Sequence, residues 1–156
     1  MRNKCLLLIL ACVLLGMQTA HAQLLFSLNP AGQTGMPGTT LTFNATLINA
    51  GASVVFLNGA STIVPGAGLF LDPNPFFNNF PLSLASGESF TKDIFSVSLD
   101  PAVLPGDYTG SFTIIGGSDS SALDDLATQN FLVSVQANHT MVPGRAPLLA
   151  SLQCLV

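Results

Sequence analysis

The sequence predicts an all-β domain, built as a sandwich of two antiparallel sheets. Apolar and polar residues alternate with a period of two through most of residues 23–137, and apolar residues at helical spacing are missing there. Segments rich in Gly, Pro, Asn or Asp separate the alternating stretches, as chain reversals require. Hydrophobic residues make up 49% of the 156-residue chain, which is enough to fill the core of one domain. Because no gap of helical length separates these stretches, a parallel sheet with crossover helices is not expected.

Short alternating runs predict about eight strands along this domain. The clearest run is 41–49, where Phe43 and Leu47 point to one face while Thr42 and Thr46 point to the other. In chain order the predicted strands are 24–28, 41–49, 53–58, 69–71, 82–84, 95–99, 108–115 and 130–135. Their number and spacing are typical of an immunoglobulin-like antiparallel β-sandwich of about seven to nine short strands.

Residues 1–22 have the three parts of a secretory signal peptide. Two basic residues near the start precede an apolar run at 5–17, and the sequence AHA at 20–22 places small residues where signal peptidase cleaves. The apolar run is shorter than the ~20 residues of a membrane-spanning helix, which argues against a signal anchor. A lipobox ending at Cys12 is a weaker alternative, because too short an apolar run would precede the cysteine. We therefore expect cleavage after residue 22 and a protein that is secreted or held in the cell envelope.

Cleavage would leave an acidic chain with a single thiol. Lys92 and Arg145 would stand against all eight carboxylates, for a net charge of −6. Nucleic acid and anionic membrane surfaces are therefore not expected partners, because little on such a surface neutralises phosphate. Cys154 would be the last cysteine, so stability must come from the apolar core rather than from an internal disulfide.

No combination of residues predicts an enzyme or a cofactor site. His139 would be the only histidine of the mature chain, and no Gly-x-Ser-x-Gly pattern occurs. Cys154 lies among apolar residues, which raise the pKa of a thiol rather than activate it. A predicted loop with Asp119, Asp124 and Asp125 offers oxygen ligands for calcium. Its spacing does not match an EF-hand loop, so we favour turn and capping roles for these carboxylates and keep the calcium site as the alternative.

The segment LDPNPFFNNFPL, residues 71–82, carries three phenylalanines in a predicted loop between the sheets. Phe76, Phe77 and Phe80 lie there among Asn and Pro residues. Aromatic loops on sandwiches can stack on sugars or on a protein partner, so these three residues are the candidate ligand contacts. The alternative, which we favour, is that the rings fold back and close one end of the core.

The stretch LPGDYTGSFTI, residues 104–114, predicts a structural corner. Pro105 restricts the backbone, Gly106 permits a tight reversal, Asp107 is placed to cap the turn, and Tyr108 begins the next strand. A tyrosine at this point of a sandwich commonly buries its ring and returns its hydroxyl to nearby backbone, an arrangement called a tyrosine corner. A glycine two residues later leaves room for a large neighbour or marks a bulge.

Several segments of the predicted domain carry a resemblance to a known class of proteins. MPGTTLTFNATLINAG, LASGESFTKDIFSVSL and LPGDYTGSFTI together resemble bacterial extracellular immunoglobulin-like domains. FFNNFPLSLASGESF with GDYTGSFTIIGGSDSSALDDLATQNFLVSV is similar to exported bacterial proteins that carry a C-terminal PEP-CTERM sorting signal. The resemblance implies a bacterial protein that acts outside the cytoplasm.

Residues 138–156 form a tail outside the predicted sandwich. Val142-Pro143 is followed by Gly144-Arg145 where the sorting signal would have Glu-Pro, and the apolar stretch after it is too short to span a bilayer. The tail therefore resembles a degenerate or truncated sorting signal, and the mature chain is not expected to cross a membrane.

These observations favour an exported, non-enzymatic structural or adhesive domain of the cell envelope or extracellular matrix. The alternative is a module that binds an extracellular polysaccharide or another envelope protein through Phe76–Phe80.

Overall fold

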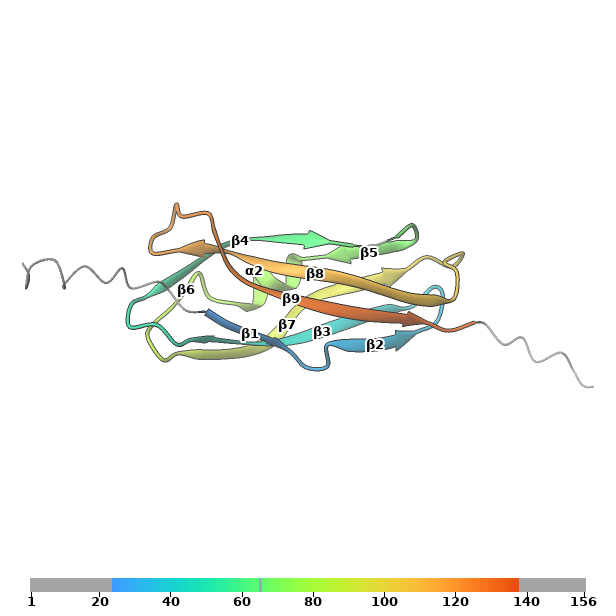
Figure 1. Ribbon diagram of the computed structural model, residues 1–156, viewed down its shortest axis with the longest axis horizontal. Helices are drawn as coiled ribbons and strands as arrows, with labels where there is room; N and C mark the ends of the chain where they lie inside the picture. The colour runs from blue at the N-terminus through green and yellow to red at the C-terminus, as the bar shows by residue number, and fades with distance from the viewer. Residues whose placement is uncertain (1–23, 65, 138–156) are drawn as a thin grey trace, which may run out of the picture.

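A computed structural model describes residues 24–64 and 66–137 of the chain (Figure 1). These residues form two β-sheets that pack face to face, which confirms the predicted all-β sandwich. The predicted signal peptide at 1–22 and the tail at 138–156, with its His139 and Cys154, lie outside the described residues.

Within the described ranges the chain forms nine strands and one short helix. In chain order these are β1 (Leu24–Leu28), β2 (Gly32–Gly35), β3 (Thr40–Asn49), β4 (Val55–Ile63), β5 (Leu69–Asp72), α2 (Asn74–Asn79), β6 (Ser83–Leu84), β7 (Ser89–Leu99), β8 (Gly106–Gly117) and β9 (Asp124–Val135). Each of the eight predicted strands overlaps one of these, while β2 and α2 are additions that the sequence analysis did not predict.

The order of strands in the two sheets is that of an immunoglobulin-like fold. One sheet has the order β1-β3-β7-β5 and the other the order β2-β9-β8-β4-β6. The first corresponds to the A, B, E and D strands of such a domain, and β4, β8 and β9 take the places of C, F and G. β2 pairs with β9 in parallel, so the second sheet is mixed rather than wholly antiparallel. The N-terminal segment thus joins both sheets, with β1 in one and β2 in the other.

Phenylalanine rings from both sheets fill the centre of the sandwich. Phe43 and Phe95 of the first sheet stack with ring centroids 4.7 Å apart, and Phe95 stacks on Phe112 of the second sheet at 5.0 Å. Phe131 of β9 packs against the Phe95 ring at 4.9 Å. A Cβ on Gly110 would overlap the Phe131 ring, so the prediction that this glycine leaves room for a large neighbour is confirmed. The alternation read from the sequence therefore places these rings between the sheets.

Asn49 is the buried polar residue of this core. Its side chain is fully inaccessible, and its Nδ2 donates to the carbonyl oxygens of Ser53 at 2.8 Å and Leu84 at 2.9 Å. Its Oδ1 accepts a hydrogen bond from the backbone N–H of Gly51 at 3.0 Å. One side chain thus ties the end of β3 to the turn that follows it and to β6, with its polar atoms satisfied.

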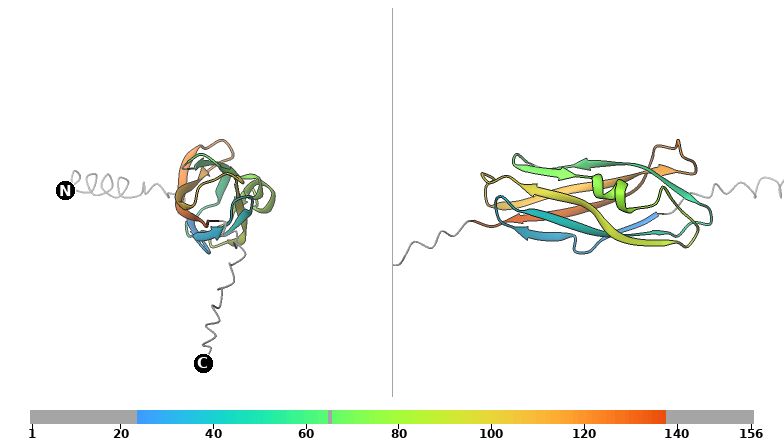
Figure 2. Two further views of the ribbon diagram at one scale, coloured as in Figure 1. Left: turned by 90° about the vertical axis from the view of Figure 1, so that its right-hand side faces the viewer. Right: turned by 180° about the vertical axis from the view of Figure 1, so that it is seen from behind.

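Helix α2 lies on the flank of the sandwich, beside β7 (Figure 2). The Nδ2 of Asn79 donates to the backbone oxygen of Asp93 at 2.9 Å, which fastens the end of the helix to that strand. No helix within the described ranges is long and apolar enough to cross a membrane.

Candidate functional site

The segment predicted as an aromatic loop is a short helix. Residues Asn74–Asn79 form α2, with Pro73 at the N-cap position and a second proline in the first turn, where the missing N–H of proline costs no hydrogen bond. The side chain of Asp72 accepts a hydrogen bond from the backbone N–H of Asn74 at 3.0 Å. The helix ends at Phe80, whose N–H donates to the Phe76 carbonyl at 3.2 Å.

Two of the three predicted contact rings are buried. Phe76 is 2% exposed and Phe80 is 7% exposed, because residues four apart in a helix share one face and this face packs on the core. Phe76 meets the Phe112 ring edge to face at 6.0 Å. Phe77 points off that face and is 53% exposed. The interpretation that we favoured, in which the rings fold back on the core, therefore holds for Phe76 and Phe80, and of the three candidate ligand contacts only Phe77 is available at the surface.

The outer face of the sheet next to α2 carries rows of hydroxyl side chains. The hydroxyls of Thr40 and Ser98 meet at 3.0 Å across β3 and β7, and those of Thr46 and Thr91 meet at 2.8 Å. These pairs lie on the face opposite the core, since side chains alternate between the two faces of a strand. The polar half of the predicted alternation thus forms a hydroxyl-rich surface, which also carries Asp72 and Asp93.

A groove separates this sheet face from α2. We call it the β5–α2 groove; its volume is about 410 Å³. Its lining comprises Thr40, Thr42, Asp72, Asn74, Pro75, Asn78, Asn79, Asp93 and Ser96. None of these residues was predicted as a site residue, because they come from three neighbouring strands and a helix that become neighbours only through strand pairing.

Hydrogen bonds hold both carboxylates of the groove in place. Asp72 accepts from the backbone of Asn74, and the Oδ1 of Asp93 accepts from the Nδ2 of Asn44 at 3.2 Å. Each of these bonds uses the Oδ1 atom of the carboxylate, so its Oδ2 atom can accept a further hydrogen bond. The groove therefore combines two fixed acceptor groups with hydroxyl and amide groups that both donate and accept.

The tyrosine corner forms at the start of β8. The hydroxyl of Tyr108 donates to the backbone oxygen of Leu104 at 2.8 Å, and its half-buried ring packs against the core. Pro105 lies in the turn, while Gly106 and Asp107 already belong to the strand. Asp107 does not cap the turn as predicted, because its Oδ1 accepts from the hydroxyl of Ser134 across the β8–β9 pair at 2.7 Å.

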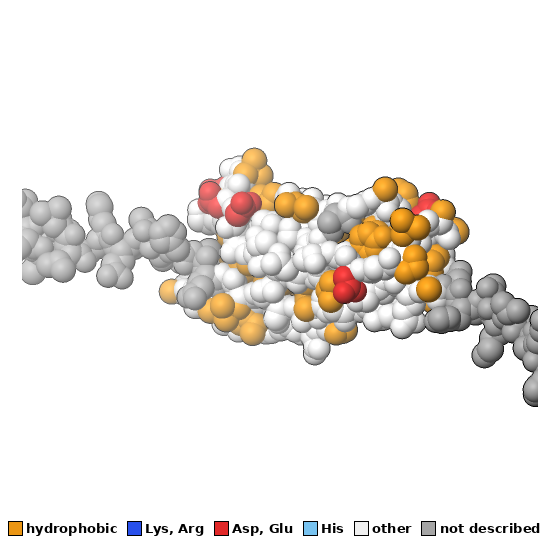
Figure 3. Space-filling view, turned by 45° about the vertical axis from the view of Figure 1, so that its right-hand side comes forward, with side chains coloured by type: hydrophobic (Ala, Val, Ile, Leu, Met, Phe, Trp, Pro, Cys, Tyr) orange, Lys and Arg blue, Asp and Glu red, His pale blue; other side chains and the backbone are white. Residues whose placement is uncertain are grey.

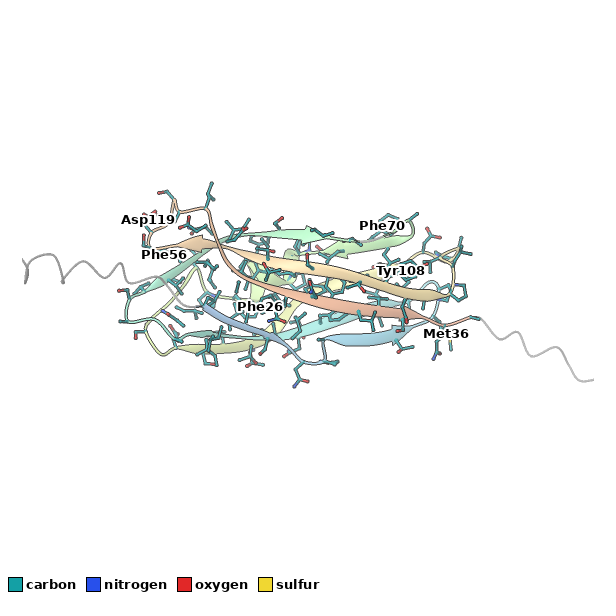
Figure 4. The ribbon with its side chains drawn as sticks, viewed as in Figure 1. Phe26, Met36, Phe56, Phe70, Tyr108 and Asp119 are labelled. Atoms are coloured by element: carbon teal, nitrogen blue, oxygen red, sulfur yellow. The ribbon has the colours of Figure 1, made fainter. Side chains whose placement is uncertain are left out.

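Exposed apolar side chains gather at the end of the sandwich that holds this corner. Met36 and Leu104 are 51% and 74% exposed. Figure 3 shows apolar surface in orange at this end, and Figure 4 labels Met36 and Tyr108 there. An adjoining groove of about 460 Å³ is lined by Ala67, Gly68, Asp100, Ala102, Val103, Leu104 and Tyr108. We call Met36, Leu104 and this groove the apolar pole.

The predicted acidic loop lies at the opposite end and is divided between a turn and a strand. Asp119 accepts hydrogen bonds from the hydroxyl and the backbone N–H of Ser121, at 2.7 and 2.8 Å, and these bonds lower the pKa of its carboxyl. Asp124 and Asp125 are not loop residues as predicted, because both pair with β8 in the first positions of β9. In the part of the chain that the structure describes, no three Asp, Glu, His or Cys residues are grouped as a metal site requires.

Comparison with known proteins adds likenesses of fold only. No family model matches the chain, and no curated protein matches it. Among solved structures, the chain is similar to part of the secreted serine protease VesC from Vibrio cholerae, with 16% identity and a TM-score of 0.44 over 67% of this chain and 21% of the protease. It is also similar to PapD-like domain 7 of human CEP192, with 16% identity and a TM-score of 0.43 over 78% of this chain and 89% of that domain. SSP-19, an MSP-domain protein like family member of Caenorhabditis elegans, matches at 13% identity and a TM-score of 0.41, over 71% and 99% of the two chains. At such identities and TM-scores these likenesses carry no conclusion about function.

Proposed function

We propose that this immunoglobulin-like module is an exported, non-enzymatic domain that acts by surface contact, as a structural or adhesive element of the cell envelope or extracellular matrix. The proposal includes cleavage of the signal peptide after residue 22. It also includes that the protein is an exported bacterial protein of the PEP-CTERM sorting-signal type, with a degenerate or truncated signal at its C-terminal end. Nucleic acid is not a proposed partner, since eight carboxylates and one lysine lie in the described ranges.

The observation that carries the proposal is the combination of sheet faces rich in hydroxyl side chains with the exposed apolar pole. The sheet faces carry hydroxyl pairs such as Thr113 with Thr128, at 2.8 Å, which bond to one another. Leu104 and Met36 instead expose apolar surface at one end, beside a groove with few charged groups. An exposed apolar patch with a polar rim is typical of a surface that meets a macromolecule.

Export is tested by expressing the full chain in a Gram-negative host and identifying its N-terminus by mass spectrometry. We expect a secreted or periplasmic protein that begins at Gln23. A protein that keeps residues 1–22 and stays in the cytoplasm would refute the export part of the proposal.

Adhesion is tested with beads coated with the exported protein. We expect these beads to cluster or to attach to bacterial envelope fragments more than albumin-coated beads do, and Leu104→Ser to reduce this attachment. Leu123→Ser is the matched control, because Leu123 is 78% exposed but lies in the β8–β9 turn at the other end of the sandwich. Equal behaviour of all the beads, or equal losses in both variants, would contradict contact through the apolar pole.

A second candidate function is binding of an extracellular polysaccharide or another envelope protein by the α2 side of the domain. The β5–α2 groove, which is lined by hydroxyl, amide and carboxylate side chains, favours it. This candidate differs from the predicted one in its contact residues, since Phe76 and Phe80 belong to the core and Phe77 does not line the groove.

A further inference from the structure

The floor of the β5–α2 groove is a row of polar side chains across three strands. Thr42 of β3 pairs in register with Ser96 of β7, which in turn pairs with Asp72 of β5. All three line the groove and lie on the sheet face turned away from the core. A ligand lying across the strands would therefore meet a hydroxyl, a second hydroxyl and a carboxylate in succession.

The wall of the groove adds amides and a second carboxylate. Asn78 and Asn79 of α2 line the groove together with Asp93 of β7, and Asn79 bonds to the Asp93 backbone. Amide and hydroxyl groups both donate and accept, whereas a carboxylate accepts only. This mixture matches a ligand whose groups also donate and accept, which is the property of sugar hydroxyls.

An exposed aromatic ring lies on the same outward face of β5, two residues from the groove lining. Phe70 is two residues before Asp72 on β5 and shares its outward face. It pairs in register with Ser98, whose hydroxyl meets that of Thr40 in the groove lining. The ring is 63% exposed (labelled in Figure 4), so its surface is available for stacking against the apolar face of a sugar ring.

The charge of the groove selects among sugars. Asp72 and Asp93 repel a uronic acid, a sulfated sugar or a phosphate, whereas they accept hydrogen bonds from neutral hydroxyls. The volume of about 410 Å³ lies within the range of small-ligand sites. Because both carboxylates and the end of α2 are held by hydrogen bonds before any ligand arrives, binding needs little reordering of the groove.

We propose that the β5–α2 groove binds one or two residues of a neutral polysaccharide, with Phe70 stacking on the sugar ring and Asp72, Asp93, Thr42 and Ser96 bonding to its hydroxyls. The inference rests on the second candidate function, for which it names the ligand class and the contact residues. It is independent of adhesion through the apolar pole.

Affinity gel electrophoresis and titration calorimetry test this proposal on the exported full chain. The probes are dextran, laminarin and β-mannan as neutral polysaccharides, and alginate as an anionic one. We expect at least one neutral polysaccharide to retard the protein and alginate not to. Phe70→Ala and Ser96→Ala should each weaken the binding about tenfold, the loss that follows from removing about 1.4 kcal/mol of contact.

Phe77→Ala is the matched control, because it removes an exposed phenylalanine that lies on α2 rather than on the sheet face that carries Asp72 and Ser96. It should leave the affinity unchanged, while circular dichroism should show that all three variants are folded.

The proposal is overturned if none of the neutral polysaccharides binds, if alginate binds as well as they do, or if Phe77→Ala weakens binding as much as Phe70→Ala. Heat from calcium chloride alone at the groove, removed by Asp72→Asn, would also overturn it in favour of a cation site. The bead assay tests the adhesive function separately. If attachment persists in Phe70→Ala and is lost in Leu104→Ser, the adhesive function stands even where the polysaccharide inference fails.

Discussion

Replacing Asn49 by Asp should make the stability of the domain depend on pH. The substitution keeps the size of the side chain but replaces its Nδ2 donor with an oxygen. That oxygen would face the carbonyl oxygens of Ser53 and Leu84, which now accept from Asn49 at 2.8 and 2.9 Å. A protonated carboxyl can still donate to one of them, whereas a carboxylate can donate to neither.

The size of the effect follows from burial. Asn49 is fully inaccessible, so the charged form of an aspartate there is disfavoured, and the pKa of such a carboxyl rises by about three units or more in the folded state. A carboxyl whose folded pKa is raised loses stability as the pH rises above its unfolded pKa of about 4. Three units correspond to about 4 kcal/mol lost between pH 4 and pH 7. The Asn49→Ala variant should instead lose about 3 kcal/mol at every pH in this range, about 1 kcal/mol for each of its three side-chain hydrogen bonds.

Urea unfolding followed by far-ultraviolet circular dichroism between pH 4 and pH 8 measures these differences. Asn130→Asp is the control, because Asn130 is exposed on β9 and its replacement should show little dependence on pH. If Asn49→Asp were as stable at pH 7 as at pH 4, relative to the unchanged protein at each pH, the buried role of Asn49 would be refuted.

Three further predictions concern the tyrosine corner, α2 and the acidic turn. Tyr108→Phe should lower the free energy of unfolding by about 1 kcal/mol, because it removes one hydrogen bond to a backbone carbonyl, and an unchanged urea midpoint would contradict the corner. Phe76→Ala should cost about 3–5 kcal/mol in the same assay and Phe77→Ala about 1 kcal/mol or less, as expected for a core ring and an exposed one. Ser121→Ala should raise the pKa of Asp119 toward its ordinary value, measured by NMR titration of the carboxyl carbon, because the hydroxyl that stabilises the carboxylate is lost. Since that pKa is lowered in the folded state, its contribution to stability is present above the unfolded pKa and is lost as the pH falls through the folded one; a titration unchanged by Ser121→Ala would rule the hydroxyl out as the cause.

The parts of the fold that the sequence predicted are those in which burial alternates strictly. In β3 the buried positions include Phe43, Ala45 and Leu47, with partly exposed residues between them, so the pattern itself identifies strand and inward face. The tyrosine corner was also predictable, because its hydrogen bond joins residues only four apart. Both features are local in the sequence.

The missing elements have no such local signal. β2 contains Gly32 and Gly35 with two polar residues between them, and it forms a strand because its backbone pairs with β9, about 100 residues later. α2 is six residues long and begins with Pro-rich sequence, too short for a helical period to show. Asp124 and Asp125 extend β9 beyond its apolar alternation because the backbone of β8 offers partners there.

The candidate site was hidden for a related reason. Thr42, Asp72 and Ser96 are far apart in the sequence and meet only because β3, β7 and β5 lie side by side. An exposed threonine or serine on any one strand is ordinary for a sheet surface. The groove could therefore be recognised only once the pairing of β3, β7 and β5 was known. The phenylalanines of 71–82 were conspicuous in sequence, but two of them fill the core.

The parallel pairing of β2 with β9 has a mechanical consequence. The described chain begins at one end of the sandwich and finishes at the other, so tension between its ends runs along the strands (Figure 1). Such a load would slide β2 lengthwise against β9, and the register pairs from Gly32 with Leu132 to Gly35 with Val135 would have to yield together rather than one after another. Resistance to force is set by the rate of unfolding rather than by equilibrium stability. This geometry loads the β2–β9 hydrogen bonds in shear when the two ends of the described chain are pulled apart.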